Sequence, residues 1–393
     1  GTNGKTSSAY FCHQILNNQG HPSLYIGTLG VYFNQEKSDK IFSTKTTPDI
    51  FELFTILHFF GFGRTPYIDG FEVPVNICIE MSSHALDQGR LNDIDLFNAT
   101  SILNISSDHL DYHKNISAYR DAKFEIFKNK SLVKLLDDKS YKLHHKYDFI
   151  VNDENKLLVI SKDNNFSDIY YEIKGISIKE TIFEISINKP PKEYNFKERK
   201  KFKFCCNVFP DFNVHNLVFA ICSIGFGGFS ENKINDLNYL RLPKGRAEII
   251  RDIPSNIIID YAHNHEAVRL FLSSIKNQYD NLIVIIGCGG GRDKSKRSKM
   301  LSAAIRDSSK VIFTSDNSRS EDFEDIFKDA AKNNNIENVV KIKDRKQAII
   351  FGAKEISNND CLVILGKGHE ETQEENNQIS YFSDHEVVNE IYN

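Results

Sequence analysis

Short apolar runs alternate along this chain with longer segments in which apolar residues recur at helical spacing. The runs typical of buried strands are Val75–Glu80, Asn98–Asn104, Ile257–Asp260, Leu282–Gly287, Val311–Thr314 and Cys361–Leu365. The amphipathic segments between such runs include Ser117–Phe127, Glu266–Gln278, Lys299–Asp307 and Glu324–Asn333. Because strands that alternate with helices usually form parallel sheets covered by those helices, the pattern predicts an α/β fold.

Residues 149–204 depart from that alternation. They are rich in Ile, Phe, Tyr and Lys, and polar and apolar residues alternate at strand spacing in Tyr170–Ile173 and Thr181–Ile187. We therefore predict an antiparallel β excursion there. Pro243 and Gly245 interrupt the pattern before a second series of strands. We place a domain boundary at that point and expect one domain over 1–242 and another over 243–393.

Composition and charge exclude several classes of protein. The 393 residues are 40% hydrophobic, and 49 Lys and Arg against 53 Asp and Glu give a net charge of −4. These values exclude general disorder and a broad polyanion-binding surface, so we expect no nucleic-acid partner. No apolar run reaches about 18 residues, so we expect no membrane partner. The seven scattered cysteines form no CxxC pair, which favours a reducing cytoplasm over a disulfide framework or zinc site.

Polar residues follow apolar runs at three places in the first predicted domain. The segment Gly1–Thr6 precedes a helical run and matches the second half of a phosphate-binding loop, in which Lys5 binds phosphate and Thr6 holds Mg²⁺. Glu80 ends a predicted strand, where parallel sheets bind ligands, and is a candidate Mg²⁺ ligand. Ser82 and Ser83 after it are also typical of a helix N-terminus.

The third segment holds Asp108, His109, Asp111 and His113 within six residues. Three interpretations stay open here: a transition-metal site, a Mg²⁺–phosphate site with one histidine contact, or a polar loop. Lys123 lies in the helical segment beyond it, and a lone helical lysine is by itself typical of a surface position.

Four polar clusters end strands in the second predicted domain, at Asp260–His263, Gly287–Lys294, Asp316–Arg319 and Gly366–Glu370. Each alone is typical of a turn, but four clusters on one sheet edge are more than turns require. Arg292 and Arg319 offer guanidinium groups for carboxylates, and Glu370 offers an acceptor for an ammonium group. The set therefore suits a zwitterionic amino acid.

Eight sequence motifs are spread over essentially the whole chain. They occur in this order: GTNGKTSS, IEMSSHALDQGRL, NISSDHLDYH, AYRDAKFEIF, DYAH, GCGGGRDKSKR, TSDNSRSED and ILGKGHE. Together they resemble the Mur ligases, and among these the ligase that adds the third residue of the peptidoglycan stem peptide. The resemblance implies a P-loop central ATP-binding domain over 1–242, with a mostly parallel sheet plus the antiparallel β excursion. It implies a Rossmann-like C-terminal α/β domain over 243–393 that binds the amino acid.

The activity implied by the resemblance is amide formation that requires ATP and Mg²⁺. The γ-carboxylate of UDP-N-acetylmuramoyl-L-alanyl-D-glutamate becomes an acyl phosphate, which the amine of the incoming amino acid then attacks. Arg319 in the Asp-Asn-x-Arg motif goes with enzymes that add meso-diaminopimelate. The family's sites lie within one chain, so we expect a monomer, in the cytoplasm.

Four other functions stay open at this point: a ligase that adds L-lysine, a folylpolyglutamate-type ligase, a truncated non-catalytic nucleotide-binding module, and a metallohydrolase built on His109, Asp111 and His113. The resemblance also implies that the first strand and a UDP-binding domain precede Gly1. We therefore expect the chain by itself to be inactive or nearly so.

The resemblance assigns roles to individual residues of this sequence. It implies that Lys5, His109 and Lys123 are catalytic, with Lys123 carbamylated. The residues expected to bind ATP are Gly1, Thr2, Asn3, Gly4, Lys5, Thr6, Ser7, Asn213, Asn216, Arg246, Asp260 and His263. Those expected to bind the UDP-muramoyl dipeptide are Thr46, Thr47, Ser82, Gln88 and Arg90. Those expected to bind the amino acid are Arg292, Asp316, Asn317, Ser318, Arg319, Gly366 and Glu370. The expected Mg²⁺ ligands are Thr6, Glu80, His109 and carbamylated Lys123.

Overall fold

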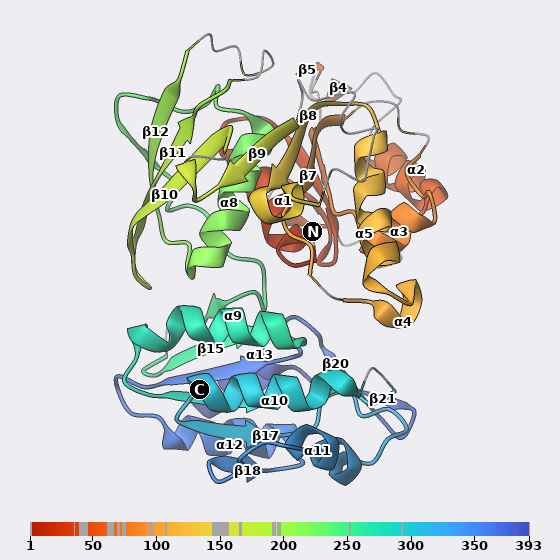
Figure 1. Ribbon diagram of the computed structural model, residues 1–393, viewed down its shortest axis with the longest axis vertical. Helices are drawn as coiled ribbons and strands as arrows, with labels where there is room; N and C mark the ends of the chain where they lie inside the picture. The colour runs from red at the N-terminus through yellow and green to blue at the C-terminus, as the bar shows by residue number, and fades with distance from the viewer. Residues whose placement is uncertain are drawn as a thin grey trace. The chain divides into compact units, whose positions relative to one another are not determined.

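The chain forms two compact units, Gly1–Arg241 and Leu242–Asn393, in the computed structural model (Figure 1). The structure describes residues 2–34, 36–38, 46–60, 67–68, 71–72, 76–92, 94, 97–106, 108–143, 157–164, 167–190, 194, 198–250, 253–291 and 294–392. No helix in these ranges combines the length and the apolar character needed to cross a membrane.

The first unit contains two main sheets. The smaller has the strand order β3-β2-β1-β6, and the larger has the order β13-β12-β11-β10-β9-β8-β7. The bounds in the smaller sheet are β1 (Ser23–Gly27), β2 (Gly30–Phe33), β3 (Glu36–Lys37) and β6 (Asn76–Ile79). Those in the larger sheet are β7 (Phe97–Ile102), β8 (Ser131–Asp137), β9 (Leu157–Ser161), β10 (Ile169–Ile176), β11 (Thr181–Ile187), β12 (Lys200–Cys206) and β13 (Ile234–Asp236). A separate two-stranded piece pairs β4 (Tyr67–Ile68) with β5 (Phe71–Glu72).

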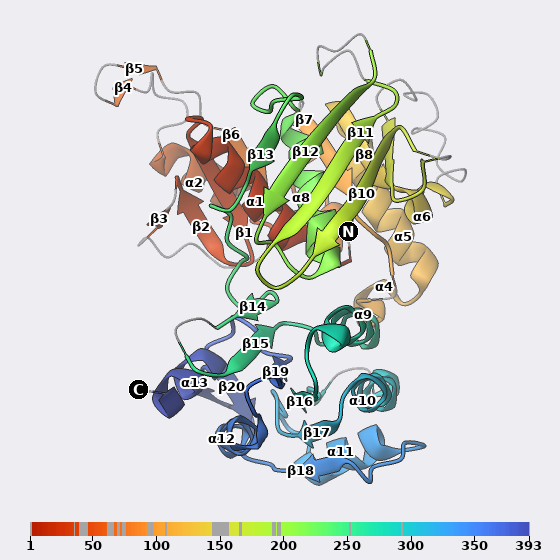
Figure 2. The ribbon, with the colours of Figure 1, turned by 90° about the vertical axis from the view of Figure 1, so that its left-hand side faces the viewer.

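Two helices pack between these two sheets (Figure 2). Helix α1 (Lys5–Asn18) packs on β1 and β6, α8 (Asp211–Ile224) packs on β7, β8 and β10, and the two helices pack on each other. Helix α8 is buried on nearly every side, as expected for a helix enclosed by other elements. Ser8 bonds to the carbonyl of Asn216, and Cys12 bonds to that of Ala220, so the helices run parallel. Their N-termini therefore lie at the same end of the unit.

The antiparallel excursion is present, as β10, β11 and β12, and it extends the parallel strands β7, β8 and β9 within one sheet. The apolar pattern did not predict β8, because Lys134 interrupts its run of apolar residues. That lysine is nevertheless only 3% exposed. The other α-helices in the described part of this unit are α2 (Ile50–Phe59), α3 (Ser83–Asp87), α4 (Leu110–His113), α5 (Ile116–Phe124) and α6 (Asp138–Tyr141).

The second unit is a six-stranded sheet of order β14-β15-β19-β16-β17-β18, parallel except for β14. Its strands are β14 (Glu248–Ile249), β15 (Asn256–Asp260), β16 (Leu282–Ile286), β17 (Lys310–Phe313), β18 (Val339–Lys341) and β19 (Cys361–Leu365). Figure 2 shows α9 (His265–Ile275), α10 (Ser295–Asp307) and α11 (Phe323–Ala331) on one face, with α12 (Arg345–Glu355) and α13 (Asp384–Tyr392) on the other.

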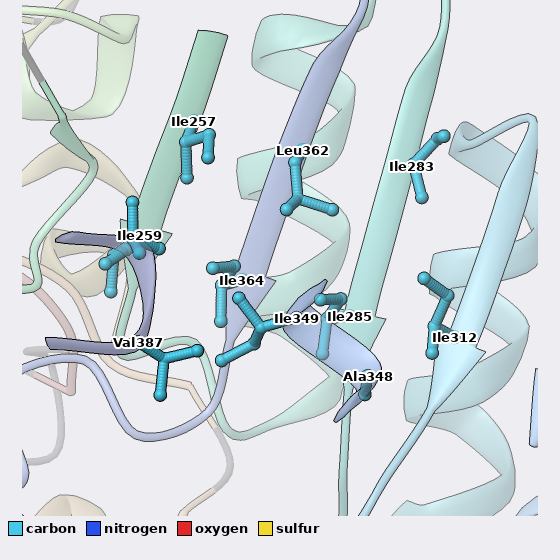
Figure 3. Close-up of a cluster of buried hydrophobic side chains, with 11 residues drawn as sticks. Ile257, Ile259, Ile283, Ile285, Ile312, Ala348, Ile349, Leu362, Ile364 and Val387 are labelled. Atoms are coloured by element: carbon cyan, nitrogen blue, oxygen red, sulfur yellow. The ribbon is translucent and has the colours of Figure 1, made fainter. Parts of the chain in front are cut away.

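Alternate residues of the central strands form the core under α12 and α13. Figure 3 shows Ile257 and Ile259 of β15, with Leu362 and Ile364 of β19, facing the same side as Ile349 of α12. The chain leaves β15 for β16 and returns later to place β19 between them. The polar segments after these strands therefore meet at the carboxyl edge of the sheet, where such folds bind ligands.

His13 of α1 is a buried group that should make the stability of the first unit depend on pH. The residue is 1% exposed, and its Nδ1 lies 2.7 Å from Ser23 Oγ. Burial lowers the pKa of His13 from 6.5 to about 4. Between these values the unfolded chain binds more protons, so the free energy of unfolding should fall as the pH falls. The contribution of His13 is roughly 2–3 kcal/mol between pH 7 and pH 4.

Urea denaturation across that pH range measures this effect. We expect His13→Gln to flatten the pH dependence, because the glutamine does not titrate. The matched variant His21→Gln, at an exposed histidine, should leave the slope of the wild type unchanged. Equal slopes for His13→Gln and the wild type would contradict the prediction.

Candidate active site

The predicted phosphate-binding loop is fixed to the end of β7. Thr2 N donates to Asn104 O at 2.9 Å, and Asn3 N donates to Asn104 Oδ1 at 2.9 Å. Gly4 has φ 85°, and a Cβ at Gly4 would lie 2.1 Å from Asn216 Oδ1, so only glycine fits. Among the residues that the structure describes, no side chain caps α1, and its first N–H groups are therefore suited to an anion. Gly1 lies outside the described residues.

The carboxylate of Glu80 lies beside this loop. Thr6 Oγ1 donates to Glu80 Oε2 at 2.9 Å, and Glu80 is 2% exposed at the end of β6. Thr28 donates through its N–H to Oε1 at 2.9 Å and through its hydroxyl to Oε2 at 3.3 Å, while the Tyr25 hydroxyl also donates to Oε1. A hydroxyl and a carboxylate at the phosphate loop are ligands suited to Mg²⁺, which usually keeps several waters.

Thr47 connects Glu80 to the residues predicted to bind the dipeptide. Its hydroxyl donates to Glu80 O at 2.7 Å and accepts from Ser82 N at 2.9 Å. Thr47 O accepts from Arg90 Nη1 at 2.7 Å, and Arg90 Nη2 donates to Gln88 Oε1 at 2.6 Å. These predicted residues thus form one hydrogen-bonded network.

The hydroxyl groups of Thr46 and Ser82 also lie in the region around Glu80 and Thr47. Thr46 Oγ1 accepts from Thr28 Oγ1 at 3.2 Å, so it also joins the network around Glu80. Ser82 Oγ accepts from Ala85 N at 3.1 Å and caps α3. The helix-cap interpretation of Ser82 is therefore confirmed, and it places Ser82 N beside Thr47.

Lys5 lies close enough to His109 and Lys123 to lower the pKa of both side chains. Lys123 is 2% exposed, and burial lowers its pKa well below the usual range; Lys5 lowers it further and Asp108 opposes the shift. Burial lowers the pKa of His109 to about 4, with Asp108 opposing and both lysines contributing. Lys5 Nζ donates to Thr2 O at 2.9 Å. Burial thus disfavours the charged forms of His109 and Lys123, and the Lys5 ammonium, ordered by Thr2 O, is the group placed to attract an anionic phosphate.

The His and Asp residues after β7 form no group of three metal-ligating side chains within the part of the chain that the structure describes. His109 adopts φ 51° as the residue before α4, and Asp108 Oδ1 accepts from its backbone N–H at 3.0 Å. The ring of His113 packs against that of Tyr119. The side chain of Asp111 lies outside the described residues. Among the described residues these contacts give no support to a transition-metal site, and the role of His109 at a Mg²⁺–phosphate site stays a prediction.

Asn213 and Asn216, predicted to contact adenine, are buried near the N-terminus of α8. Asn216 Nδ2 donates to Asn213 Oδ1 at 3.1 Å, and Asn213 Nδ2 donates to Phe209 O at 3.2 Å. Both residues therefore have partners within the protein, and Asn216 also lies against Gly4. Contact with adenine stays a prediction for both.

In the second unit, Arg246, Asp260 and His263 lie around Tyr261. The Arg246 guanidinium stacks 4.5 Å from the centroid of the Tyr261 ring, and His263 Nδ1 lies 2.8 Å from Tyr261 O. Asp260 accepts from Ala247 N at 2.6 Å and from Ala262 N at 2.8 Å. Burial raises the pKa of Asp260, and the Arg246 charge opposes this shift.

The residues predicted to bind the amino acid meet beyond β17 and β19. Asn317 Nδ2 donates to Glu370 Oε2 at 3.1 Å, and Tyr261 OH donates to Glu370 Oε1 at 3.1 Å. Gly366 has φ 112°, and a Cβ there would lie 3.0 Å from Asp316 Oδ2. The fully buried Lys367 lies 3.5 Å from Glu370 Oε2 and 3.8 Å from Asp316 Oδ1. A buried lysine therefore lies between these two acidic side chains.

Arg319 lies at the end of the segment Asp316–Arg319, which follows β17. Its φ of 53° is uncommon for a side chain of this size, and its Nη1 donates to Gly290 O at 2.8 Å and to Asn317 O at 3.2 Å. Ser318 beside it is 3% exposed. Arg292 lies outside the described residues. Two backbone carbonyls therefore order the guanidinium of Arg319.

Comparison with known proteins identifies relatives over the whole length of this chain. Residues 1–224 match the family model for the Mur ligase middle domain, and residues 245–368 match that for the Mur ligase, glutamate ligase domain. The UDP-N-acetylmuramoyl-L-alanyl-D-glutamate–2,6-diaminopimelate ligase of Clostridium perfringens is 32% identical over 400 residues, covering 100% of this chain and 77% of the relative. The ligase of that name from Wigglesworthia glossinidia brevipalpis is 33% identical over 409 residues, covering 100% and 76%.

Solved structures agree with the predicted fold class. A structure of a ligase with the same name superposes with a TM-score of 0.65 and 29% identity, covering 100% of this chain and 76% of that one. Folylpolyglutamate synthase from Thermotoga maritima has a TM-score of 0.60 at 18% identity, covering 93% and 84%. At that identity the second likeness concerns the fold alone.

Proposed function

The chain belongs to the Mur ligase family, and we propose that it is an ATP-dependent ligase that joins meso-diaminopimelate to UDP-N-acetylmuramoyl-L-alanyl-D-glutamate in peptidoglycan synthesis. Relatives with this activity in their names align with the whole chain. We expect the enzyme to act as a cytoplasmic monomer. The observation that carries the proposal is the network around Glu80, which connects Thr6 at the phosphate loop to the groups assigned to the dipeptide.

The contacts in the first unit suggest how phosphoryl transfer would proceed. The uncapped N–H groups of α1 and the Lys5 ammonium bind the phosphate oxygens of ATP. The γ-carboxylate of D-glutamate attacks the γ-phosphorus, and ADP leaves as the acyl phosphate forms. The oxygens of Thr6 and Glu80 would hold Mg²⁺, which would supply positive charge beside the transferred group. Arg90, ordered by Thr47 and Gln88, positions the dipeptide.

The second unit would supply the amine. Glu370, oriented by Tyr261 and Asn317, accepts a hydrogen bond from the incoming ammonium group. After the ammonium group loses a proton to water, the neutral amine nitrogen attacks the acyl carbon, phosphate leaves, and loss of a second proton to water completes the amide bond. Positioning of this amine accounts for much of the rate of such a step. Arg319 binds the carboxylate at the far end of the diaminopimelate.

Release of ADP with each amino acid tests the proposal. The purified full-length protein is incubated with ATP, Mg²⁺ and the muramoyl dipeptide, together with either meso-diaminopimelate or L-lysine. We expect ADP release to be faster with meso-diaminopimelate, because L-lysine lacks the distal carboxylate that Arg319 would bind. Faster release with L-lysine would contradict the substrate assignment, and ADP release that does not depend on the dipeptide would contradict the ligase assignment.

Replacement of Arg319 by alanine should impair use of the amino acid far more than use of ATP. We expect the KM for meso-diaminopimelate to rise about 10- to 100-fold, the effect of losing hydrogen bonds to a charged group. The KM for ATP should stay essentially unchanged. Arg319→Lys keeps the charge but loses the planar fork, so it should recover only part of the loss. Equal increases in both KM values would indicate a general structural defect and would contradict this role.

A further inference from the structure

His215 of α8 stands between the two asparagines that are predicted to contact adenine, but its own hydrogen bonds run to other elements. Its Nε2 lies 3.1 Å from Leu103 O, directly after β7, and its Nδ1 lies 2.9 Å from the hydroxyl of Tyr171 in β10. Leu103 and Tyr171 are both buried, so these contacts lie inside the unit. The ring of His215 therefore joins α8 to two strands of the larger sheet.

The partners of the ring determine which of its nitrogens carries the proton. Leu103 O can only accept a hydrogen bond, so Nε2 must carry a hydrogen and donate it. Burial lowers the pKa of His215, and the bond to Leu103 O opposes this shift only in part. The ring is therefore neutral near pH 7, and Nδ1 accepts from the Tyr171 hydroxyl. Both nitrogens thus have partners in the sheet.

The bond to Leu103 reaches the chain one residue before the anchor of the phosphate-binding loop. That anchor is Asn104, whose backbone carbonyl accepts from Thr2 N and whose Oδ1 accepts from Asn3 N, both at 2.9 Å. The loop itself is thus held by Asn104, and His215 connects α8 to the residue directly before it. Loss of the His215 bond would leave the contacts of the loop in place while releasing α8 from β7.

A second bond holds α8 from the side of α1. Ser8 Oγ donates to Asn216 O at 2.9 Å. Successive residues lie about 100° apart around a helix, so His215 and Asn216 hold α8 from different directions. Rotation of α8 about its axis would break at least one of these bonds. Together they determine how Asn213 and Asn216 are oriented toward a nucleotide.

On the basis of the proposed use of ATP, we propose that His215 is a positioning residue that fixes Asn213 and Asn216 relative to the phosphate-binding loop. It acts through the Nε2–H bond to Leu103 O, and Tyr171 holds the ring in place by donating to Nδ1. ADP and ATP span both the asparagines and the loop, so their affinity depends on this alignment. Inorganic triphosphate occupies the loop alone, so its affinity does not.

Two amide substitutions separate the roles of the two ring nitrogens. In His215→Gln the amide reaches the position of Nε2 and can donate to Leu103 O, whereas in His215→Asn it reaches only that of Nδ1. Calorimetric titration of the purified full-length protein with ADP and Mg²⁺ measures the effect. We expect the Kd for ADP to rise about 3- to 10-fold in His215→Asn, as for the loss of one hydrogen bond, and to stay within about twofold of the wild type in His215→Gln. The Kd for inorganic triphosphate should be the same in all three proteins.

Tyr171→Phe and Tyr170→Phe form a matched pair on β10. Neighbouring residues of a strand face opposite sides of their sheet, so Tyr170→Phe removes a hydroxyl that points away from His215. In Tyr171→Phe the ring keeps its bond to Leu103 O but loses its other partner. We expect a smaller rise in the Kd for ADP in Tyr171→Phe than in His215→Asn, and none in Tyr170→Phe.

The contrast between the two ligands distinguishes positioning from a general role in the fold. An equal rise in the Kd values for ADP and for inorganic triphosphate would show that His215 only maintains the structure of the unit. Equal Kd values for ADP in His215→Gln and His215→Asn would show that the bond to Leu103 O is not the group that acts. Either result overturns the inference while leaving the proposed ligase activity intact. A wild type that does not bind ADP contradicts the proposed function and this inference with it.

Discussion

Replacement of Lys5 by alanine should lower kcat by at least about 10³-fold, the largest effect that we expect from a single substitution in this chain. Lys5 is the first residue of α1, directly after the left-handed Gly4. Its ammonium donates to Thr2 O within the phosphate loop. Phosphoryl transfer places negative charge on the oxygens of the γ-phosphate, and a preorganised cation stabilises that charge more in the transition state than in the ground state.

The test must show that a fall in kcat does not result from misfolding of the variant. Lys142→Ala removes an exposed lysine of the same unit and should leave kcat unchanged. Thermal unfolding of Lys5→Ala should match that of the wild type, because the side chain is only partly buried. Lys5→Arg keeps a positive charge but replaces a compact ammonium by a planar fork, and should recover only a small part of the rate. Normal turnover by Lys5→Ala would contradict the assigned role of the loop.

The main site positions could be predicted because they follow a simple rule of parallel sheets. Glu80, Asp260 and Asp316 each come at or soon after the end of a short apolar run, and such ends share one edge of their sheet. The strand–helix alternation predicts the α/β fold. Where an apolar run is broken, the rule fails: β8 contains the buried Lys134, which reads as an exposed residue.

The contacts that complete the site could not be predicted, because they join residues far apart in the sequence. Thr28 lies in a turn 52 residues before Glu80, yet it donates two hydrogen bonds to that carboxylate. Lys367 stands between two glycines, a pattern typical of an exposed turn, but it is fully buried between Asp316 and Glu370. In both cases the tertiary fold, which brings distant strand ends together, decides the environment of the side chain.

Lys123 is another residue whose environment could not be predicted from the sequence. Its replacement is the second substitution from which we expect a large loss of activity. A lone lysine on an amphipathic helix is typical of the surface, whereas the structure buries this one to 2% exposure. Burial and the nearby Lys5 charge lower the pKa of Lys123 well below the usual range. A larger fraction of this side chain is therefore the neutral amine than in an ordinary lysine. A neutral amine can add to CO₂: the nitrogen forms a bond to carbon and loses a proton, and a carbamate results. That product turns a potential cation into an oxygen ligand suited to Mg²⁺.

We therefore expect Lys123→Ala to lower kcat by about 10²- to 10³-fold, since a charged group that orders the metal is lost. Lys123→Arg should be equally impaired, because a guanidinium stays protonated and forms no carbamate. A small carboxylate such as acetate should restore part of the activity of Lys123→Ala by entering the space left by the side chain, and it should not affect the wild type. Lys128→Ala is the matched control: Lys128 lies five residues further on, is 54% exposed and pairs with Glu125. Full activity in Lys123→Arg would mean that charge alone is required at this position and would exclude the carbamate.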